Sequence, residues 1–435
     1  MKFKPLKGTK DFLPAEMILR QQVIEKIKTI FENFGFQPLE TPALESWEVL
    51  AAKGAGGEEI LKETYSFEDR GGRKIGLRYD LTVPLARVVA QNPDLPLPFK
   101  RYQIQKVWRY GDVAKGRLRE FLQCDIDIVG SASMLADAEI IACAIACLKA
   151  LGFEDFVVRL NNRKILNALV KYAGIEAAKV LDVLRSIDKL EKIGRGGVKK
   201  ELKEKKIPEK SIGKIFELIE IKGTPDEIFE RVEKLIKDFE EGIEGINELK
   251  ELIAWLERMK CSKYVKIDLS LARGLDYYTG PIFEFFAEKG IGSIAAGGRY
   301  DKLIGLFAKK DLPATGVSLG IERIIEVMKE RKMIETKKCK TKVFVACASD
   351  EVRNKILEIV FMLRENGIPT DFDLRGRNLT RQLKYADSLG IPYVIIVGKK
   401  ELEAGKVKIR KMDEKKELEL EIDEILKFFE KGSLS

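Results

Sequence analysis

Histidine is absent from all 435 residues of the sequence. Hydrolases with a serine or cysteine triad use an imidazole as base, and most zinc sites use it as a ligand. The absence therefore excludes these kinds of site. Any chemistry must be carried out by carboxylates, arginine side chains, bound metal and the substrates themselves, and we expect no dedicated protein site for a metal.

Cysteine is scarce, and long apolar runs are missing. The six cysteines include no Cys-x-x-Cys pair, which favours reduced, mostly buried thiols over metal ligands or disulfides. No stretch is apolar over the length needed to cross a bilayer. The N-terminus, Met-Lys-Phe-Lys-Pro-Leu-Lys, has neither an apolar core nor a cleavage site. We therefore expect a cytoplasmic protein without a secretory signal.

The remaining composition is that of a large globular protein. Hydrophobic residues make up 45% of the chain, enough for sizeable cores, and the length predicts roughly two to four domains. The net charge of +9 suits a polyanionic partner. A lysine-rich solvated surface would give the same charge.

Two arginines flank a predicted hairpin in the second half of the chain. The segment 282–286 is rich in β-formers and is bounded by glycine and proline. Arg273 and Arg299 stand beside glycines at its two ends, where each guanidinium could bind a carboxylate or phosphate with two hydrogen bonds. The alternative is that they are turn arginines paired with Asp276 and Asp301.

The motifs around these arginines are specific in combination. Arg-Gly-Leu-Asp-Tyr-Tyr at 273–278 and Gly-Gly-Arg-Tyr-Asp at 297–301 resemble the two signature motifs of histidyl-tRNA synthetases, which are class II aminoacyl-tRNA synthetases. The resemblance implies that Arg273, Tyr277 and Tyr278 contact histidine and that Arg273 is also catalytic. It gives a supporting role to residues of the second motif, namely Gly298, Arg299 and Tyr300.

The N-terminal region predicts a helix over 15–33 and a strand over 37–40, followed by Thr41-Pro42. This order resembles the first class II motif, which builds the dimer interface in that family. The resemblance therefore implies a homodimer.

An acid and a hydroxyl follow a predicted strand, Lys74 to Tyr79. Asp80 and Thr82 could bind an α-ammonium group, or could simply cap a helix that has Pro84 in its first turn. Arg-Tyr-Asp-Leu-Thr at 78–82 resembles the segment that holds the substrate amino group in the family, which implies histidine contacts from Asp80, Leu81 and Thr82.

Two long strands, 100–110 and 118–129, are expected to form an antiparallel pair. Alternation places Gln123, Asp125 and Asp127 on one side of the second strand. Two carboxylates and an amide suit a polar, partly cationic ring such as imidazole. A solvated sheet face is the alternative.

This strand pair resembles the second class II motif, in the form found in archaea and eukaryotes. The resemblance implies that Arg109 is catalytic and binds the substrate carboxylate and the α-phosphate of ATP, and that Gln123 and Asp127 recognise histidine. The chain departs from the family at Gly111, where an acid is usual, and at Ala114, where bacterial members have glutamine. Arg117 and Arg119 are candidate replacements for the lost tRNA contact.

Residues 163–260 are predicted to form a helical insertion, with breaks at 194–197 and 223–225. Its basic run, 199–210, could meet RNA or could be a solvated face. Further on, residues 314–323 resemble the third class II motif. There Arg323 inherits a role in binding ATP.

Residues 329–342 form a predicted linker, and the alternation of strands and helices in 343–435 predicts a small α/β domain. This domain resembles the anticodon-binding domain of class IIa synthetases. Its candidate RNA contacts are Arg375, Arg377, Arg381 and Lys384.

The resemblance as a whole implies an α+β catalytic domain on a mostly antiparallel sheet, formed by residues 1–162 and 261–328. It also implies that L-histidine, ATP with Mg2+ bound through its phosphates, and tRNA(His) are the substrates and partners of a histidine ligase, with no membrane partner. A histidine-sensing paralogue such as the regulatory subunit of ATP phosphoribosyltransferase is the main alternative. An RNA-binding module without chemistry, or a synthetase for another amino acid, fits the motifs less well.

Overall fold

The structure is a computed structural model that describes residues 3–52, 58–272, 277–287, 292–334 and 336–431. Contacts between Cα atoms divide the chain into two compact units, residues 1–11 with 23–334 and residues 12–22 with 335–435. Within the described ranges, no helix is both long enough and apolar enough to cross a bilayer.

An eight-stranded sheet forms the centre of the first unit, in the order β1-β5-β6-β11-β10-β9-β7-β8. Neighbouring strands are antiparallel except for the parallel pairs β1–β5 and β7–β8, which confirms the expected α+β class. The strands are β1 (Gln37–Pro38), β5 (Phe99–Trp108), β6 (Glu120–Val129), β7 (Val157–Asn162), β8 (Val265–Ile267), β9 (Pro281–Phe286), β10 (Ala295–Arg299) and β11 (Ala314–Gly320).

Both predicted antiparallel pairs are confirmed: β5 pairs with β6 along its full length, and β9 pairs with β10. β1 is shorter than the strand predicted over 37–40, although the N–H of Leu39 still donates to the Tyr102 carbonyl of β5 at 2.9 Å. The short strand β8 was not predicted.

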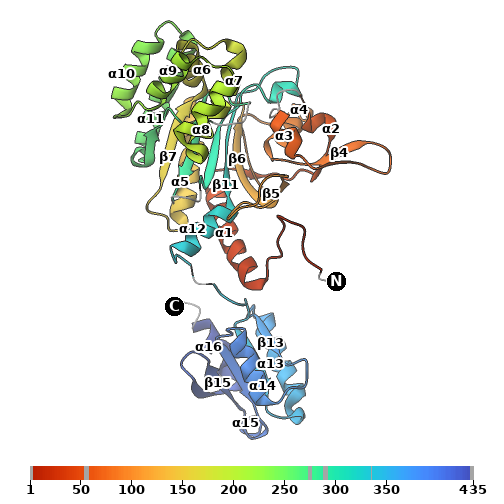
Figure 1. The fold of residues 1–435 in the computed structure, drawn as a ribbon. Helices are drawn as coiled ribbons and strands as arrows, with labels where there is room; N and C mark the ends of the chain where they lie inside the picture. Colours follow the sequence, from red (N-terminus) through yellow and green to blue (C-terminus); the bar gives the residue numbers. More distant parts are fainter. Residues whose placement is uncertain (1–2, 53–57, 273–276, 288–291, 335, 432–435) are drawn as a thin grey trace. The chain divides into compact units, whose positions relative to one another are not determined.

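Helices cover the sheet, and a smaller sheet projects from it. α5 (Met134–Ala150) packs against β6, β10 and β11, and α12 (Ile321–Glu330) follows β11 directly. The smaller sheet extends outward as a ribbon (Figure 1). The remaining elements here are residues 23–33 of α1 (Pro14–Asn33), which matches the prediction, β2 (Leu44–Ser46), α2 (Trp47–Leu50), α3 (Glu58–Glu63), β3 (Ser66–Glu68), β4 (Lys74–Leu77) and α4 (Thr82–Gln91).

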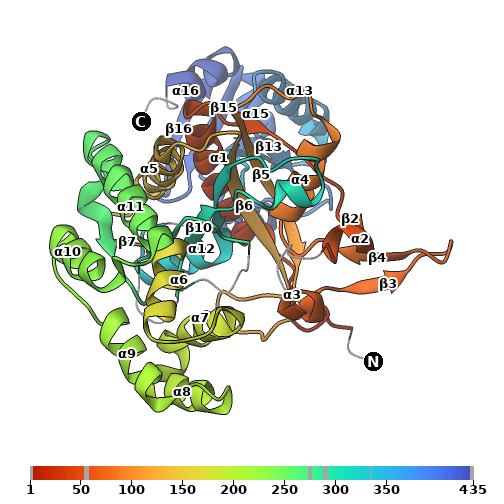
Figure 2. The same cartoon turned by 90° about the horizontal axis from the view of Figure 1, so that it is seen from above.

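The predicted helical segment consists of six helices on the side of the unit away from the β3–β4 ribbon (Figure 2). They are α6 (Arg163–Tyr172), α7 (Val180–Ile187), α8 (Leu190–Glu204), α9 (Glu209–Ile219), α10 (Pro225–Ile236) and α11 (Glu240–Arg258). One buried apolar cluster runs from Val183 and Phe216 in these helices to Leu85 and Tyr278 beside the central sheet. The helices therefore share a core with the sheet.

Both predicted breaks in the helical segment are present. α8 consists of two helices that meet at a kink at Gly194, whose φ of 66° and ψ of 174° are not helical. Glycine adopts this positive φ without strain because it has no Cβ. The break at 223–225 is confirmed, because Thr224 and Glu227 form a reciprocal capping box at the start of α10.

The second unit holds a five-stranded sheet in the order β13-β12-β14-β15-β16. The first three strands are parallel and the last two are added antiparallel. The predicted alternation is confirmed, and only the short α15 was missed. The elements are β12 (Val343–Cys347), α13 (Arg353–Glu365), β13 (Thr370–Phe372), α14 (Leu379–Ser388), β14 (Tyr393–Val397), α15 (Lys399–Glu403), β15 (Lys406–Lys411), β16 (Lys416–Glu421) and α16 (Ile425–Lys431).

Candidate active site

A polar face lies on the large sheet where β5 and β6 pair. The register places three pairs of polar residues opposite one another, and side chains two residues apart share a face. The predicted common side of Gln123, Asp125 and Asp127 is therefore confirmed, and both carboxylates are buried. We call the six residues the polar face: Arg101 opposite Asp127, Gln103 opposite Asp125 and Gln105 opposite Gln123.

Arg101 and Tyr300 hold Asp127 from two directions. The guanidinium of Arg101, which is 0% exposed, places Nη2 2.7 Å from Asp127 Oδ2. The Tyr300 hydroxyl donates a short hydrogen bond to Asp127 Oδ1. Burial raises the pKa of Asp127, and the charge of Arg101 opposes that rise. Asp127 is thus fixed in position before any ligand arrives.

Arg101 is a residue that the sequence analysis missed. An arginine inside a strand is usually taken as solvent-facing, and its partner lies on the next strand. The available signal was the alternation of Arg101, Gln103 and Gln105, which repeats the spacing of the three polar residues on β6.

Several buried polar atoms of this face have no hydrogen-bond partner within the described protein. They include Gln123 Oε1, Asp125 Oδ1, Arg101 Nε and Asp127 Oδ2. Asp127 Oδ2 does form an ion pair with Arg101. Burial, first of all, raises the pKa of Asp125 to about 7; Arg101 lowers it and Asp127 raises it further. Because an unsatisfied buried acceptor is costly, the three oxygens call for a ligand that brings N–H donors.

Two glycines opposite this face make room for its side chains. A Cβ on Gly316 of β11 would lie 2.0 Å from Asp127 Oδ1. A Cβ on Gly298 of β10 would lie 2.9 Å from the ring of Tyr278. Both distances are too short for any other residue, so the supporting role expected of Gly298 has a steric basis.

Three tyrosines gather beside Asp127. The ring of Tyr277 lies 5.0 Å from that of Tyr278 and 6.0 Å from that of Tyr300, between centroids. All three are buried. Arg273 and Asp276, which precede them in the first signature motif, lie outside the described residues.

Asp80 borders the polar face but also caps a helix. Its Oδ1 accepts the backbone N–H groups of Thr82 at 3.1 Å and Val83 at 3.0 Å, at the start of α4. The capping alternative therefore describes this oxygen. Burial raises the pKa of Asp80, and the charges of Arg109 and Arg101 oppose that shift. The Leu81 carbonyl accepts a hydrogen bond from Arg101 at 3.2 Å.

Arg109 follows β5 directly and is held by stacking. Its Cζ lies 4.2 Å from the ring centroid of Tyr79 and 5.2 Å from that of Phe121. Nε donates to the Tyr79 carbonyl at 3.1 Å. Across the part of the chain that the structure describes, its Nη atoms make no hydrogen bond and no ion pair. The guanidinium is positioned, with its two-pronged edge available to a carboxylate or phosphate.

Arg299 is different, because it is held by the protein itself and does not present a free guanidinium edge. All five of its N–H donors are used within the protein: Nε and Nη2 bond Asp137, Nη1 bonds Asp301 at 3.1 Å, and the Ser131 and Ser133 carbonyls take the rest. Arg299 is 2% exposed. The alternative, pairing with Asp301, is confirmed, with Asp137 as an additional buried partner.

The third-motif arginine lies close to the loop that follows β5. Arg323 Nη1 donates to the Ser293 carbonyl at 2.6 Å. A Cβ on Gly116 would lie 3.2 Å from Arg323 Cγ. In the same loop Arg117 is exposed, whereas Arg119 donates to the Gly111 carbonyl and stacks 3.9 Å from the ring centroid of Tyr110.

The RNA-contact candidates of the second unit also fall into two groups, one bonded to neighbouring side chains and one exposed. Arg377 stacks 4.1 Å from the ring centroid of Tyr385 and lies 3.3 Å from Asp373. Arg375, Arg381 and Lys384 are exposed. In the helical segment, Lys199 and Lys203 form ion pairs with Glu209, which is the arrangement expected of a solvated face.

Comparison with known proteins agrees with this geometry. The family model described as histidyl-tRNA synthetase matches residues 8–324, and the model described as anticodon binding domain matches residues 342–432. The chain belongs to the histidyl-tRNA synthetase family. The histidine–tRNA ligase of Gloeobacter violaceus is 43% identical over 434 residues, covering 93% of each chain.

Two solved structures extend the family assignment to the fold. The histidyl-tRNA synthetase of Nostoc sp. PCC 7120 superposes with a TM-score of 0.83 at 32% identity, covering 97% of this chain and 98% of that one. A Bacillus halodurans protein described as ATP phosphoribosyltransferase regulatory subunit/histidyl-tRNA synthetase has a TM-score of 0.76 at 25% identity, covering 91% and 98%. The class II synthetase fold and its C-terminal anticodon-binding domain are thus present.

Proposed function

We propose that the chain is a histidine–tRNA ligase that activates L-histidine with ATP and transfers it to the 3′ end of tRNA(His). The observation that carries this proposal is the polar face of β5 and β6. Its unsatisfied buried acceptors lie on β6. Arg109, whose Nη atoms bond none of the described residues, directly follows β5, the strand paired with β6.

Histidine suits the polar face because it brings N–H donors at both ends. Its imidazole and ammonium groups can satisfy the oxygens of Gln123, Asp125 and Asp127. Asp80, which interacts with the charges of both Arg109 and Arg101, and Thr82 are assigned to the ammonium group. The rings of Tyr277 and Tyr278 provide flat walls.

In the first step the histidine carboxylate attacks the α-phosphorus of ATP, a P–O bond forms, and the bond to pyrophosphate breaks. No protein base is needed, because a carboxylate is already ionised at neutral pH. Arg109, and by resemblance Arg273, stabilise the charge that develops on the phosphate, so catalysis consists of positioning and electrostatic stabilisation. Arg323 is assigned to the nucleotide.

Mg2+ is assigned to the ATP phosphates. Within the described ranges, no group of three or more acidic or cysteine side chains could hold a metal by itself. Mg2+ keeps several of its waters and usually binds through substrate phosphates, so it does not need a cage of protein side chains. Bound there, it neutralises the charge of the departing pyrophosphate.

In the second step the terminal ribose hydroxyl of tRNA attacks the histidyl carbonyl and AMP leaves. We assign Arg117 and Arg119 to the acceptor end, and Arg375, Arg377, Arg381 and Lys384 to the anticodon side. The proposed domains are 1–162 with 261–328 for catalysis, 163–260 as the helical insertion, 329–342 as linker and 343–435 for the anticodon. A cytoplasmic homodimer completes the proposal.

ATP–pyrophosphate exchange tests the proposal, with purified protein, Mg2+, no tRNA and each of the twenty amino acids in turn. Exchange with histidine alone is expected. The variant Arg273→Ala should bind histidine more weakly and nearly lose exchange. Histidine binding without exchange would favour the regulatory paralogue, one of the two roles in the description of the Bacillus halodurans protein.

A further inference from the structure

A buried arginine, Arg78, anchors one end of the polar face. It directly follows β4 and is 3% exposed. Its Nε donates to the Lys106 carbonyl at 2.9 Å. Its Nη1 bonds the Thr41 carbonyl at 2.5 Å, the Pro42 carbonyl at 3.2 Å and Gln105 Oε1 at 2.8 Å. This guanidinium therefore ties β5 to the chain that leads from β1 to β2.

The guanidinium of Arg78 decides how the neighbouring amide is turned. Because arginine has donors only, Gln105 must present its oxygen to Arg78. The same oxygen accepts the backbone N–H of Thr41 at 3.3 Å and a side-chain N–H of Gln103 at 2.5 Å. Gln103 must therefore turn its nitrogen toward Gln105. That nitrogen also donates to the Thr41 hydroxyl at 2.8 Å.

The orientation of Gln103 in turn sets what Arg101 meets. With its nitrogen turned to Gln105, Gln103 presents Oε1 to Arg101, whose Nη1 lies 3.3 Å away. Nη2 of the same guanidinium bonds the Leu81 carbonyl at 3.2 Å and pairs with Asp127 at 2.7 Å. A flipped Gln103 would place N–H donors against N–H donors. Arg101 would then lose one of the contacts that hold it beside Asp127, a carboxylate assigned to histidine.

We propose that Arg78, Gln105 and Gln103 are positioning residues for histidine recognition. Their alternating donors and acceptors hold Arg101, and through it Asp127, in one arrangement, as a fully satisfied buried network does. The inference rests on the proposed function and deepens it. The three residues act through Arg101, whereas Asp127 faces the substrate.

Two isosteric substitutions separate the requirements at Gln105 and Gln103. Gln105 accepts in each contact described above, and a carboxylate can also accept, facing the cation of Arg78. Gln103 must donate, which an ionised carboxylate cannot do, and its charge would compete with Asp127 for Arg101. Histidine Kd, measured by calorimetry on the full chain without tRNA, should rise at least about tenfold more in Gln103→Glu than in Gln105→Glu. Equal effects would overturn the proposal.

Gln103→Met tests for the kinetic signature of positioning. Methionine keeps the approximate volume of the side chain but removes the amide. In histidine-dependent pyrophosphate exchange, the KM for histidine should rise about tenfold. The KM for ATP should stay within about twofold of wild type, because the nucleotide is assigned to Arg109 and Arg323. A variant that was merely less stable would contain less folded enzyme and change neither KM. An unchanged KM for histidine, or equal increases in both, would contradict the positioning role.

A double variant tests whether Arg78 and Gln103 act through one chain of contacts. Arg78→Met and Gln103→Met should each weaken histidine binding. In Arg78→Met/Gln103→Met the loss should not exceed that of the more affected single variant by more than about twofold, because both changes break the same network. Additive losses would show that the two residues act independently. If Arg78→Met does not fold, the two Gln103 variants decide the question.

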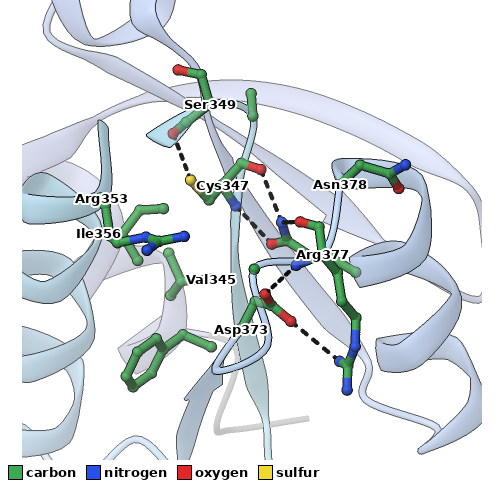
Figure 3. A pocket seen from close by; sticks show the side chains of 12 residues that line it. Val345, Cys347, Ser349, Arg353, Ile356, Asp373, Arg377 and Asn378 are labelled. Carbon is green, nitrogen blue, oxygen red and sulfur yellow. Dashed lines mark hydrogen bonds and ion pairs between the residues drawn. The ribbon is translucent and has the colours of Figure 1, made fainter. Parts of the chain in front are cut away.

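Gln382 in the second unit provides a matched control. Its buried amide lines a cavity of about 220 Å3 (Figure 3). The amide accepts the N–H of Cys347 at 2.9 Å and donates to the Cys347 and Arg377 carbonyls at 3.0 Å and 2.6 Å. Gln382→Glu thus makes the same chemical change as Gln103→Glu, in an amide that also accepts and donates but belongs to the other unit.

Gln382→Glu should lower the free energy of unfolding of the second unit and leave histidine Kd unchanged. Weaker histidine binding in this variant, equal to that of Gln103→Glu, would show that the loss follows from destabilisation and would overturn the proposal. All these outcomes are read in a wild-type protein that exchanges pyrophosphate with histidine. Absence of that exchange in the wild type would instead refute the proposed function.

Discussion

The ends of β5 and β10 each present an arginine, and the two arginines have opposite roles. Arg299, at the end of β10, uses all five N–H donors on Asp137, Asp301 and two backbone carbonyls. Arg109, after β5, is held mainly by the faces of Tyr79 and Phe121, and its Nη atoms bond none of the described residues. A motif arginine is therefore best assigned by counting which of its donors the protein already uses.

Removing the Arg109 side chain should affect rate far more than stability. For Arg109→Ala we expect a loss of about 10³-fold in histidine-dependent pyrophosphate exchange, the magnitude found when one donor to a developing charge is deleted. Thermal unfolding should change little, because among the described residues the side chain makes a single hydrogen bond, to the Tyr79 carbonyl, besides its stacking on Tyr79 and Phe121. Near-normal exchange would show that the free donors have no catalytic role.

Removing the Arg299 side chain should do the reverse. In Arg299→Met, Asp137 would be left buried without its partner, so the free energy of unfolding should fall by about 3–5 kcal/mol in urea titration. Activity per folded molecule should persist at low temperature. The double variant Arg299→Met/Asp137→Leu should recover part of the stability, since an apolar pair replaces the ion pair. A stable Arg299→Met protein without exchange activity would contradict the structural assignment.

The same contrast shows how far sequence reasoning reaches. Alternation along β6 placed Gln123, Asp125 and Asp127 on one face, because the two-residue period of a strand is local. It could not find the Arg101–Asp127 pair, since that depends on the register of the two predicted strands. It could not find the Arg299–Asp137 pair either, since that depends on which helix lies alongside β10. The sequence also could not show that the N–H donors of Arg299 are all used, because two of them bond the backbone carbonyls of Ser131 and Ser133.

The buried carboxyl group of Asp125 on the polar face should make the stability of the protein depend on pH. Asp125 has a pKa of about 7 in the folded protein, against an ordinary value of 3.8, so the folded state binds more protons between about pH 4 and pH 7. Over that window the contribution of Asp125 to the free energy of unfolding should fall as pH rises, and its full penalty should be present above pH 7.

Asp125→Asn removes this titration. We compare the free energy of unfolding of the variant with that of the wild type, by urea unfolding at pH 5 and pH 8. The difference in favour of the variant should be larger at pH 8 by on the order of 1 kcal/mol or more. Asp371→Asn, which lies on β13 of the other unit, is the control and should show no such pH-dependent difference. Equal stability differences at the two pH values would mean that Asp125 is ionised throughout.

The smallest effect concerns what holds Arg109 in place. Tyr79 contributes its ring face to Arg109 and donates from its hydroxyl to Glu63 at 3.1 Å. Tyr79→Phe keeps the ring, so kcat/KM for exchange should stay within about twofold of wild type. Tyr79→Leu removes the stacking surface, and a loss of about 0.5–2 kcal/mol of cation–π energy predicts a decrease of roughly 2- to 30-fold. If phenylalanine and leucine were equally harmful, the hydroxyl contact with Glu63 would be what positions Arg109, and stacking would not be.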